Sequence, residues 1–284
     1  MRRFRLQRVT RDDVRGLLDT WVPRGVRAVH FTGGEPTLHR ELADILLDCR
    51  RRSLHTGIGT NGWRLADAAY AARVLPLLDE AMLSLHGPDA TTHDALTGRP
   101  GSFDRVMRAL SHLRGPGVNI VVTRDSLASV AATASLAVAR GARFLLVSAV
   151  APEGEADRHY RALAVPLRAV AAMAEGVLRA VGDALPVRFF GLPACALGGA
   201  RVRSNDLYWS PRVTVEWALQ EGRPSLTPIV SERPDRGRAP VTACASCLWR
   251  GSCPGPFVRY VAEFGDQEIV PIGVSSRGCM PAQP

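Results

Sequence analysis

Phe31-Thr32-Gly33-Gly34-Glu35-Pro36-Thr37-Leu38 follows a short apolar stretch, residues 26–31, and leads into a segment with helical periodicity, residues 38–52. The two glycines let the backbone take positive φ or approach a ligand closely, and the proline directs the chain outward. Glu35 is then expected at the carboxyl edge of a sheet, where it can accept hydrogen bonds from an ammonium group. This order of strand, glycine-rich turn and helix predicts a βα unit that carries a site at its turn.

Strand and helix patterns alternate through the first 150 residues. Strands are predicted at 26–31, 55–60, 81–85, 118–123 and 144–150. Helices are predicted at 10–21 (with Thr10 as its cap), 38–52, 65–78, 102–113 and 127–140, and a longer Ala-rich helix at 160–180. The alternation predicts right-handed βαβ units, a parallel sheet and the α/β class. A βα barrel opens on a strand, whereas this chain opens on a helix, so we expect its first strand to be missing upstream.

Two further predicted strands end in small polar residues and glycine. The second strand runs into Thr60-Asn61-Gly62, and the third into Ser84-Leu85-His86-Gly87. In a parallel sheet the ligand lies at the carboxyl ends of the strands. Three neighbouring strand ends of this kind therefore predict one shared binding site.

These motifs, in this order and together with His93-Asp94 and residues 97–104, resemble the radical S-adenosylmethionine (radical SAM) enzymes over about residues 10–155. The resemblance implies a partial (β/α)6 radical SAM barrel that binds S-adenosylmethionine. Gly33, Gly34 and Glu35 would hold its amino group, and Asn61 and Ser84 would lie along its ribose and carboxylate. Pro36 belongs to the same motif, and Arg124 would add a polar contact at the end of a later strand.

The sequence departs from that family in its cysteines. Family members carry Cys-x3-Cys-x2-Cys before the glycine pair, and these three thiolates leave one iron of a [4Fe–4S] cluster free to bind S-adenosylmethionine. No cysteine precedes Cys49, which lies on the apolar face of a predicted helix and is interpreted as core. We expect the motif, and with it a second cluster, upstream of Met1. The alternative is a relative that has lost its catalytic cluster.

A second metal site is predicted near the carboxyl terminus. Cys244-x2-Cys247-x5-Cys253 has the spacing of a metal-binding turn, with glycine and proline between the cysteines or next to them. Spacing alone does not separate an iron–sulfur cluster from zinc bound by four thiolates. Proline, glycine and cysteine become frequent from about residue 185, which predicts two domains, residues 1–184 and residues 185–284.

The tail also resembles the SPASM and twitch domains, which carry auxiliary clusters in many radical SAM enzymes. The resemblance implies one auxiliary [4Fe–4S] cluster bound by Cys195, Cys244, Cys247 and Cys253, with Cys279 as the other candidate for the fourth ligand. The full SPASM pattern would have further cysteines near residues 195 and 257, which this chain lacks.

The family resemblance implies an enzyme of the oxidoreductase or maturase type. It would cleave S-adenosylmethionine reductively to a 5′-deoxyadenosyl radical, which abstracts hydrogen from a peptide or a small molecule. The electron donor would be a protein such as flavodoxin or ferredoxin. Two alternatives remain open: a non-catalytic relative that keeps the cluster and binds a peptide or partner enzyme, and a zinc-binding module.

Composition narrows the class of protein further. The chain has 284 residues, 46% of them hydrophobic, and a formal net charge of +9, which excludes a disordered or collagen-like chain. All 36 basic residues are arginine, scattered along the chain, and only 6% of residues are aromatic, which argues against nucleic acid as the main partner. No apolar run approaches the roughly 18–20 residues of a membrane span, and no signal peptide opens the chain, so we expect a cytoplasmic protein without a disulfide scaffold.

Overall fold

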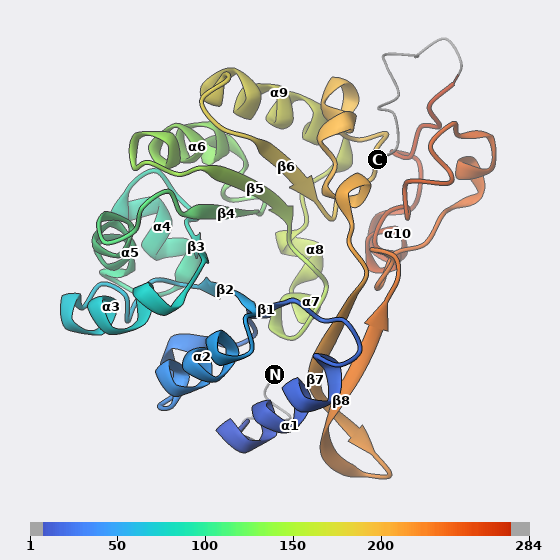
Figure 1. Cartoon of the computed structure of the whole chain (residues 1–284). Coiled ribbons are helices and arrows are strands. Elements are labelled where there is room, and N and C mark those ends of the chain that lie inside the picture. The colour runs from blue at the N-terminus through green and yellow to red at the C-terminus, as the bar shows by residue number, and fades with distance from the viewer. Residues whose placement is uncertain (1–7, 274–284) are drawn as a thin grey trace.

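A sheet of six parallel strands forms the amino-terminal part of the computed structural model, which describes residues 8–273 (Figure 1). Each strand lies beside the next one along the chain, in the order β1-β2-β3-β4-β5-β6. The strands span Ala28–Phe31 (β1), His55–Thr60 (β2), Glu80–Ser84 (β3), Gly117–Val122 (β4), Phe144–Ala149 (β5) and Val187–Phe190 (β6). The five predicted strands and the α/β class are thus confirmed.

Helices connect these strands and cover the convex face of the curved sheet (Figure 1). The longer ones span Arg11–Trp21 (α1), Leu42–Arg51 (α2), Ala68–Val74 (α3), Ala90–Thr97 (α4), Ser102–Ser111 (α5), Val130–Ala139 (α6) and Val170–Val181 (α9). Short 3-10 helices span Pro36–Leu38, Leu75–Leu77, Leu127–Ser129, Leu167–Ala169, Gly198–Arg203, Asn205–Tyr208 and Thr242–Ser246. The first described element is therefore a helix, α1, as predicted, and Thr10 caps it by accepting a hydrogen bond from the Asp13 amide.

The core lies between the sheet and these helices. Residues of the central strands alternate, so that Leu83, Ile120 and Leu145 are fully buried on the helix-covered face. The opposite face carries polar side chains, among them Asn119 and Ser148, which are joined by a hydrogen bond of 2.8 Å. Within the described residues, no helix has both the length and the apolar character that a membrane crossing requires.

The continuous helix predicted at residues 160–180 is wrong. The structure has Glu155–Arg158 (α7) and Tyr160–Leu163 (α8), then an extended segment, and only then α9. Pro166 lies in the break, where its backbone has a ψ of 130°. Proline cannot donate a hydrogen bond within a helix and disfavours helical backbone at the residue before it. The helix propensity of the Ala-rich segments on either side therefore does not produce one continuous helix.

The carboxyl-terminal part contains an antiparallel hairpin that sequence periodicity did not reveal. Its strands span Arg212–Gln220 (β7) and Arg223–Ser231 (β8), and a last helix, α10, spans Val258–Phe264. The hairpin projects away from the sheet (Figure 1). Strand β6 lies beyond residue 184, so the six-stranded sheet extends into the segment assigned to the second domain; the division at 184 and 185 itself stays a prediction.

Candidate functional site

Gly33 and Gly34 form an open turn at the carboxyl end of β1. Their φ angles are 82° and 56°, in the left-handed region where glycine is favoured. A Cβ atom added to either residue would meet no other atom within 4 Å. The turn therefore exposes its backbone amides and carbonyls to a ligand, with no neighbouring side chain in the way.

The carboxylate of Glu35 joins the ends of β1 and β2. Its Oε1 accepts hydrogen bonds from the Thr37 amide at 3.1 Å, the Thr37 hydroxyl at 2.7 Å and the Thr60 hydroxyl at 2.6 Å. Its Oε2 accepts one from the Asn61 amide at 2.8 Å. A carboxylate oxygen can accept more than one hydrogen bond, so Oε2 keeps capacity for an ammonium group.

Asn61 and Ser84 lie at the same edge of the sheet. Asn61 follows β2 and is exposed, and its Oδ1 accepts a hydrogen bond from the Trp63 amide at 2.9 Å. Ser84 ends β3, the strand next to β2. Pro36 begins the 3-10 helix that follows Glu35. The structure thus places Gly33, Gly34, Glu35, Pro36, Asn61 and Ser84 at the carboxyl ends of three adjacent strands, and their contacts with a cofactor stay a prediction.

Arg124 has different surroundings. Its guanidinium lies over the ring of Phe264 in α10, 5.4 Å from the ring centroid, and its amide donates to the Leu163 carbonyl at the end of α8. These contacts tie the end of β4 to the carboxyl-terminal helix and do not join Arg124 to the turn at Gly33. A role for Arg124 in cofactor binding stays a prediction.

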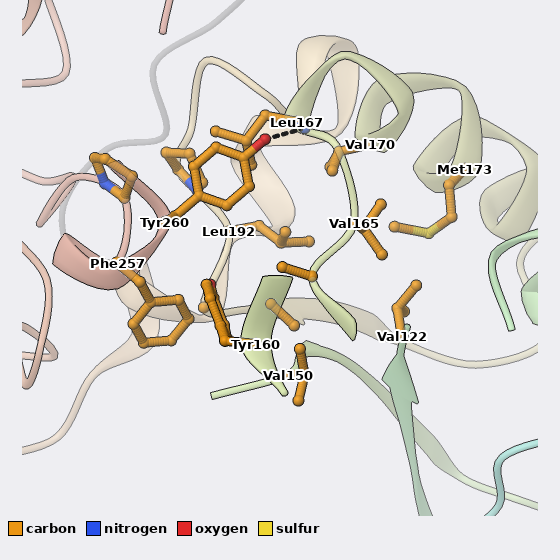
Figure 2. Close-up of a pocket in the computed structure, with 15 residues that line it drawn as sticks. Val122, Val150, Tyr160, Val165, Leu167, Val170, Met173, Leu192, Phe257 and Tyr260 are labelled. Atoms are coloured by element: carbon orange, nitrogen blue, oxygen red, sulfur yellow. Dashed lines mark hydrogen bonds between the residues drawn. The ribbon is translucent and has the colours of Figure 1, made fainter. Parts of the chain in front are cut away.

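An apolar pocket lies at the carboxyl ends of the other three strands, β4, β5 and β6 (Figure 2). Val122 ends β4, Val150 follows β5, and Leu192 follows β6 shortly after its end. Tyr260 of α10 closes another side of the pocket, and its hydroxyl accepts a hydrogen bond from the Leu167 amide at 3.0 Å. The sheet edge is therefore polar at β1 to β3 and apolar at β4 to β6, where the carboxyl-terminal helix packs against it.

The motif around His93 and Asp94 has a structural role. The Asp94 carboxylate accepts hydrogen bonds from the Gly101 and Phe103 amides, at 2.6 and 2.8 Å, and so caps the start of α5. The rings of His86 and His93 stack with their centroids 5.8 Å apart. Burial, together with His93, lowers the pKa of His86 to about 4, so this imidazole is neutral at pH 7.

Four cysteines line one cavity in the carboxyl-terminal part. Cys195, Cys244, Cys247 and Cys253 surround a space of about 390 Å³, counting the volume open to solvent. The Ala194 amide donates to Cys253 Sγ at 3.4 Å. Although the first two of these cysteines are 49 positions apart in sequence, the fold brings them together. Burial raises the pKa of Cys195 to about 11.

Backbone amides around this cavity point at sulfur. Besides the Ala194 amide, the Ile272 amide donates to sulfur and reaches Cys247 Sγ at 3.4 Å. Amide donors of this kind are common around thiolates that bind iron–sulfur clusters. Within residues 8–273, no group of three or more His, Cys, Asp or Glu side chains is placed so that it could hold one metal ion. Cys279 lies outside the described residues.

The model of the radical SAM superfamily matches residues 1–125. The chain contains a radical SAM domain. The predicted S-adenosylmethionine contacts, from Gly33 to Arg124, all lie inside this domain, whereas Cys195, Cys244, Cys247 and Cys253 lie beyond it. The match to this superfamily implies S-adenosylmethionine and a [4Fe–4S] cluster.

The chain resembles curated proteins over part of their length. It is 32% identical over 123 residues to an AdoMet-dependent heme synthase of Nitratidesulfovibrio vulgaris, covering 42% of this chain and 33% of that one. It is 31% identical over 189 residues to a PqqA peptide cyclase of Ruegeria pomeroyi, covering 62% of this chain and 50% of that one. The chain thus spans between a third and a half of these relatives.

The fold also matches a solved structure. The crystal structure of Streptococcus suis SuiB bound to precursor peptide SuiA superimposes with a TM-score of 0.53 and 19% identity, covering 64% of this chain and 42% of that one. The predicted fold class, an α/β radical SAM fold, is therefore confirmed.

Residues 1–125 contain one cysteine, Cys49. It is fully buried in α2 in a cluster with Leu18 and Leu54, and burial raises its pKa to about 11. Its interpretation as a core residue is confirmed. A buried, protonated thiol does not fit a cluster that must contact S-adenosylmethionine, so residues 1–125 do not provide the three-thiolate site.

Sequence reasoning missed one feature of the second site, a buried ion pair between Asp206 and Arg238 beside the four-cysteine cavity. The two residues are 32 positions apart, and neither belongs to a recognisable motif. Only the folded arrangement reveals them.

Proposed function

We propose that this chain binds S-adenosylmethionine at the carboxyl ends of β1, β2 and β3, binds an auxiliary [4Fe–4S] cluster at four cysteines, and acts on a peptide as part of a radical SAM enzyme. The observation that carries the proposal is the turn at Gly33 and Gly34 beside Glu35. An open backbone turn and a fixed carboxylate meet there, at the edge where parallel sheets bind ligands.

The residues of this edge can hold an amino acid-like group. The carbonyls of Gly33 and Gly34, together with Glu35 Oε2, accept hydrogen bonds from an ammonium group. Asn61 and Ser84 offer polar groups for a ribose hydroxyl or a carboxylate. When bound, S-adenosylmethionine would supply the hydrogen-abstracting radical of this family. Residues 1–125 do not provide the three-thiolate site for a cluster. The role of the residues at this edge is therefore to bind and orient the cofactor.

The four-cysteine cavity fits an auxiliary cluster. Cys195, Cys244, Cys247 and Cys253 supply four thiols, the number that a fully ligated [4Fe–4S] cluster takes, and backbone amides donate to two of them, Cys247 and Cys253. Thiolates that bind different irons of a cluster lie further apart than thiolates that share one zinc ion. Among the described residues, no three of these thiols are placed so that they could hold one metal ion, which favours the cluster over zinc.

A peptide substrate is supported by the relatives. One curated relative is a PqqA peptide cyclase, and SuiB was crystallised with its precursor peptide SuiA. This chain covers only part of these proteins, so the peptide enters the proposal as a class and not as a particular sequence. An electron donor such as flavodoxin or ferredoxin belongs to the same proposal.

The 284-residue chain, reconstituted anaerobically with iron and sulfide, tests both sites. We expect about four irons per chain, the content of one [4Fe–4S] cluster, no zinc, and saturable binding of S-adenosylmethionine by calorimetry. One zinc per chain without iron would overturn the cluster, and absence of binding would overturn the S-adenosylmethionine site.

Catalysis is tested separately, by adding dithionite and measuring 5′-deoxyadenosine by chromatography. The assay compares the 284-residue chain with a version extended through the codons immediately upstream of Met1. Formation of 5′-deoxyadenosine by the extended version supports the enzyme. Binding without any cleavage by either version would favour the non-catalytic relative instead.

A further inference from the structure

Asp206 and Arg238 form an ion pair that is almost completely removed from solvent. Each side chain is 2% exposed. Arg238 Nη1 donates to both carboxylate oxygens of Asp206, at 2.9 and 2.8 Å, and Arg238 Nε donates to the Gly255 carbonyl at 2.8 Å. Burying a charged pair costs desolvation free energy, so a completely buried pair requires a physical explanation.

One donor of this buried guanidinium has no partner. Arg238 Nη2 is enclosed, yet it makes no hydrogen bond to the described residues. Buried N–H groups are nearly always satisfied, and an unpaired one on a charged group points to a missing acceptor. Nε and Nη2 share one edge of the planar guanidinium, so the unpaired donor lies on the side of Gly255.

Gly255 connects that edge to the four-cysteine cavity. Gly255 lines the cavity two residues after Cys253, and its carbonyl accepts a hydrogen bond from Arg238. A Cβ at Gly255 would lie 2.3 Å from the Ala239 carbonyl oxygen, so the backbone passes here at a distance that only glycine permits. The guanidinium is thereby fixed to the backbone two residues after a predicted cluster ligand, Cys253.

The positive member of the pair is the one bound to the cysteine segment. Arg238 donates through Nε to the carbonyl of Gly255, two residues after Cys253, whereas Asp206 accepts from Nη1. The positive end of the pair therefore lies on the side of the cysteine segment, and Asp206 lies at the other edge of the guanidinium. A positive charge held in a buried place acts strongly, since little water screens it.

We propose that Arg238 Nη2 donates a hydrogen bond to sulfur in the four-cysteine site and that this raises the reduction potential of the cluster bound there. The inference rests on the proposed auxiliary cluster. Reduction adds one electron, so the reduced cluster is more negative by one charge and gains more from a nearby guanidinium than the oxidised cluster does. Arg238 tunes the cluster, and Asp206 is the positioning residue that keeps Arg238 in place.

The test is a redox titration of the reconstituted 284-residue chain, with dithionite as reductant and the EPR signal of the reduced cluster as readout. Arg238→Gln combined with Asp206→Asn removes both charges and leaves no unpaired ion. We expect the equilibrium constant for reduction of the cluster to fall about tenfold. For a one-electron couple this is a reduction potential about 59 mV lower. Arg238→Lys keeps the charge without the fork of donors and should shift the potential in the same direction by less.

A second arginine–carboxylate pair in the same segment is the matched control. Arg236 donates to both oxygens of Glu216, at 3.0 and 3.1 Å, but its side chain is 57% exposed. Arg236→Gln with Glu216→Gln should leave the equilibrium constant for reduction within about twofold of the wild-type value, because water screens exposed charges. An unchanged potential in both Arg238 variants, or an equal shift in the control, would overturn the inference.

Iron content separates this inference from the function on which it rests. A wild-type chain that binds no iron refutes the auxiliary cluster itself. A chain that binds about four irons, with a potential that Arg238 does not affect, refutes the inference alone. Should the double variant fail to fold by circular dichroism, Arg238→Lys decides the question, since it keeps the ion pair with Asp206.

Discussion

Glu35 and Asn61 are joined by a hydrogen bond of 2.8 Å, from the Asn61 amide to the Glu35 carboxylate, across the ends of two neighbouring strands. The other oxygen of Glu35 receives three further hydrogen bonds, from Thr37 and Thr60. The carboxylate therefore fixes the shape of the strand-end turn before any ligand arrives. Such preorganisation lowers the entropic cost of binding.

Glu35→Gln should weaken S-adenosylmethionine binding at least tenfold. The amide can keep an acceptor toward Thr37 and Thr60, but its NH2 group would then face the Asn61 amide, which is also a donor. Because this leaves a donor unpaired, the free energy of unfolding should fall by about 1–3 kcal/mol. Calorimetry measures the affinity and urea denaturation the stability.

The matched control is Glu41→Gln, since Glu41 is exposed and its side chain caps no amide of α2. We expect that variant to bind and unfold like the wild type. Normal affinity in Glu35→Gln would show that the carboxylate does not shape the site.

Gly33→Ala tests whether the open turn faces the cofactor. An alanine at positive φ costs roughly 1–2 kcal/mol of stability wherever it stands. Gly141→Ala is a matched control, because Gly141 has a φ of 78°, close to the 82° of Gly33, and likewise no atom near its added Cβ. Both variants should lose similar stability, and only Gly33→Ala should lose affinity for S-adenosylmethionine. Equal affinities in the two variants would place the ligand elsewhere.

The sequence pattern predicted those parts of the fold that depend on neighbouring residues. The strand at residues 118–123 was predictable because the segment is rich in valine and isoleucine, and its side chains alternate between buried and half-buried positions in the structure. The strand-end motifs were predictable because glycine marks the turns. The break at Pro166 was not predicted because an Ala-rich composition surrounds this single proline. The hairpin of β7 and β8 had a usable signal, the Glu221-Gly222 turn between two stretches of nine residues, with positive φ at both turn residues.

Contacts between distant residues were not predictable from the sequence. The four cysteines could be grouped only through a family resemblance, since Cys195 and Cys244 are 49 positions apart in sequence. The pairing of Asp206 with Arg238 had no signal at all, because neither periodicity nor spacing reports which charged residues become buried together. Such pairs depend on tertiary packing, which a single sequence does not display.

Cys195→Ala should abolish or strongly reduce iron binding, because three thiolates would then remain for four irons. The absorbance of the cluster at about 400 nm should be lost with the iron. Cys49→Ala is the control: Cys49 is fully buried in α2, and its loss should lower stability without changing the iron count. Iron analysis after reconstitution gives the answer. A full iron content in Cys195→Ala would transfer the fourth-ligand role to another residue, with Cys279 as the next candidate to substitute.

Asp48 connects α1 to α2, and its protonation should loosen that connection. The carboxylate is buried and accepts hydrogen bonds from Arg11 at 2.7 Å, Arg15 at 2.9 Å and Arg51 at 3.0 Å. Leu18 is the buried residue of α1, so the docking of this helix depends strongly on the ion pairs. Asp48→Asn should lower the free energy of unfolding at pH 7 by about 2–3 kcal/mol.

The pH dependence identifies the cause of that loss. Hydrogen bonds from Arg11 and Arg15 hold the pKa of Asp48 well below its usual range. The carboxylate therefore stabilises the fold fully above the ordinary aspartate pKa of about 3.9, and this contribution disappears as the pH falls toward the lowered value of the folded state. Urea denaturation between pH 7 and pH 3 should show the gap between the wild type and Asp48→Asn narrowing with falling pH. Asp44→Asn, an exposed change one turn earlier in α2, should differ little from the wild type in free energy of unfolding over the same pH range. If the difference for Asp48→Asn instead stays constant down to pH 3, packing and not charge accounts for the effect.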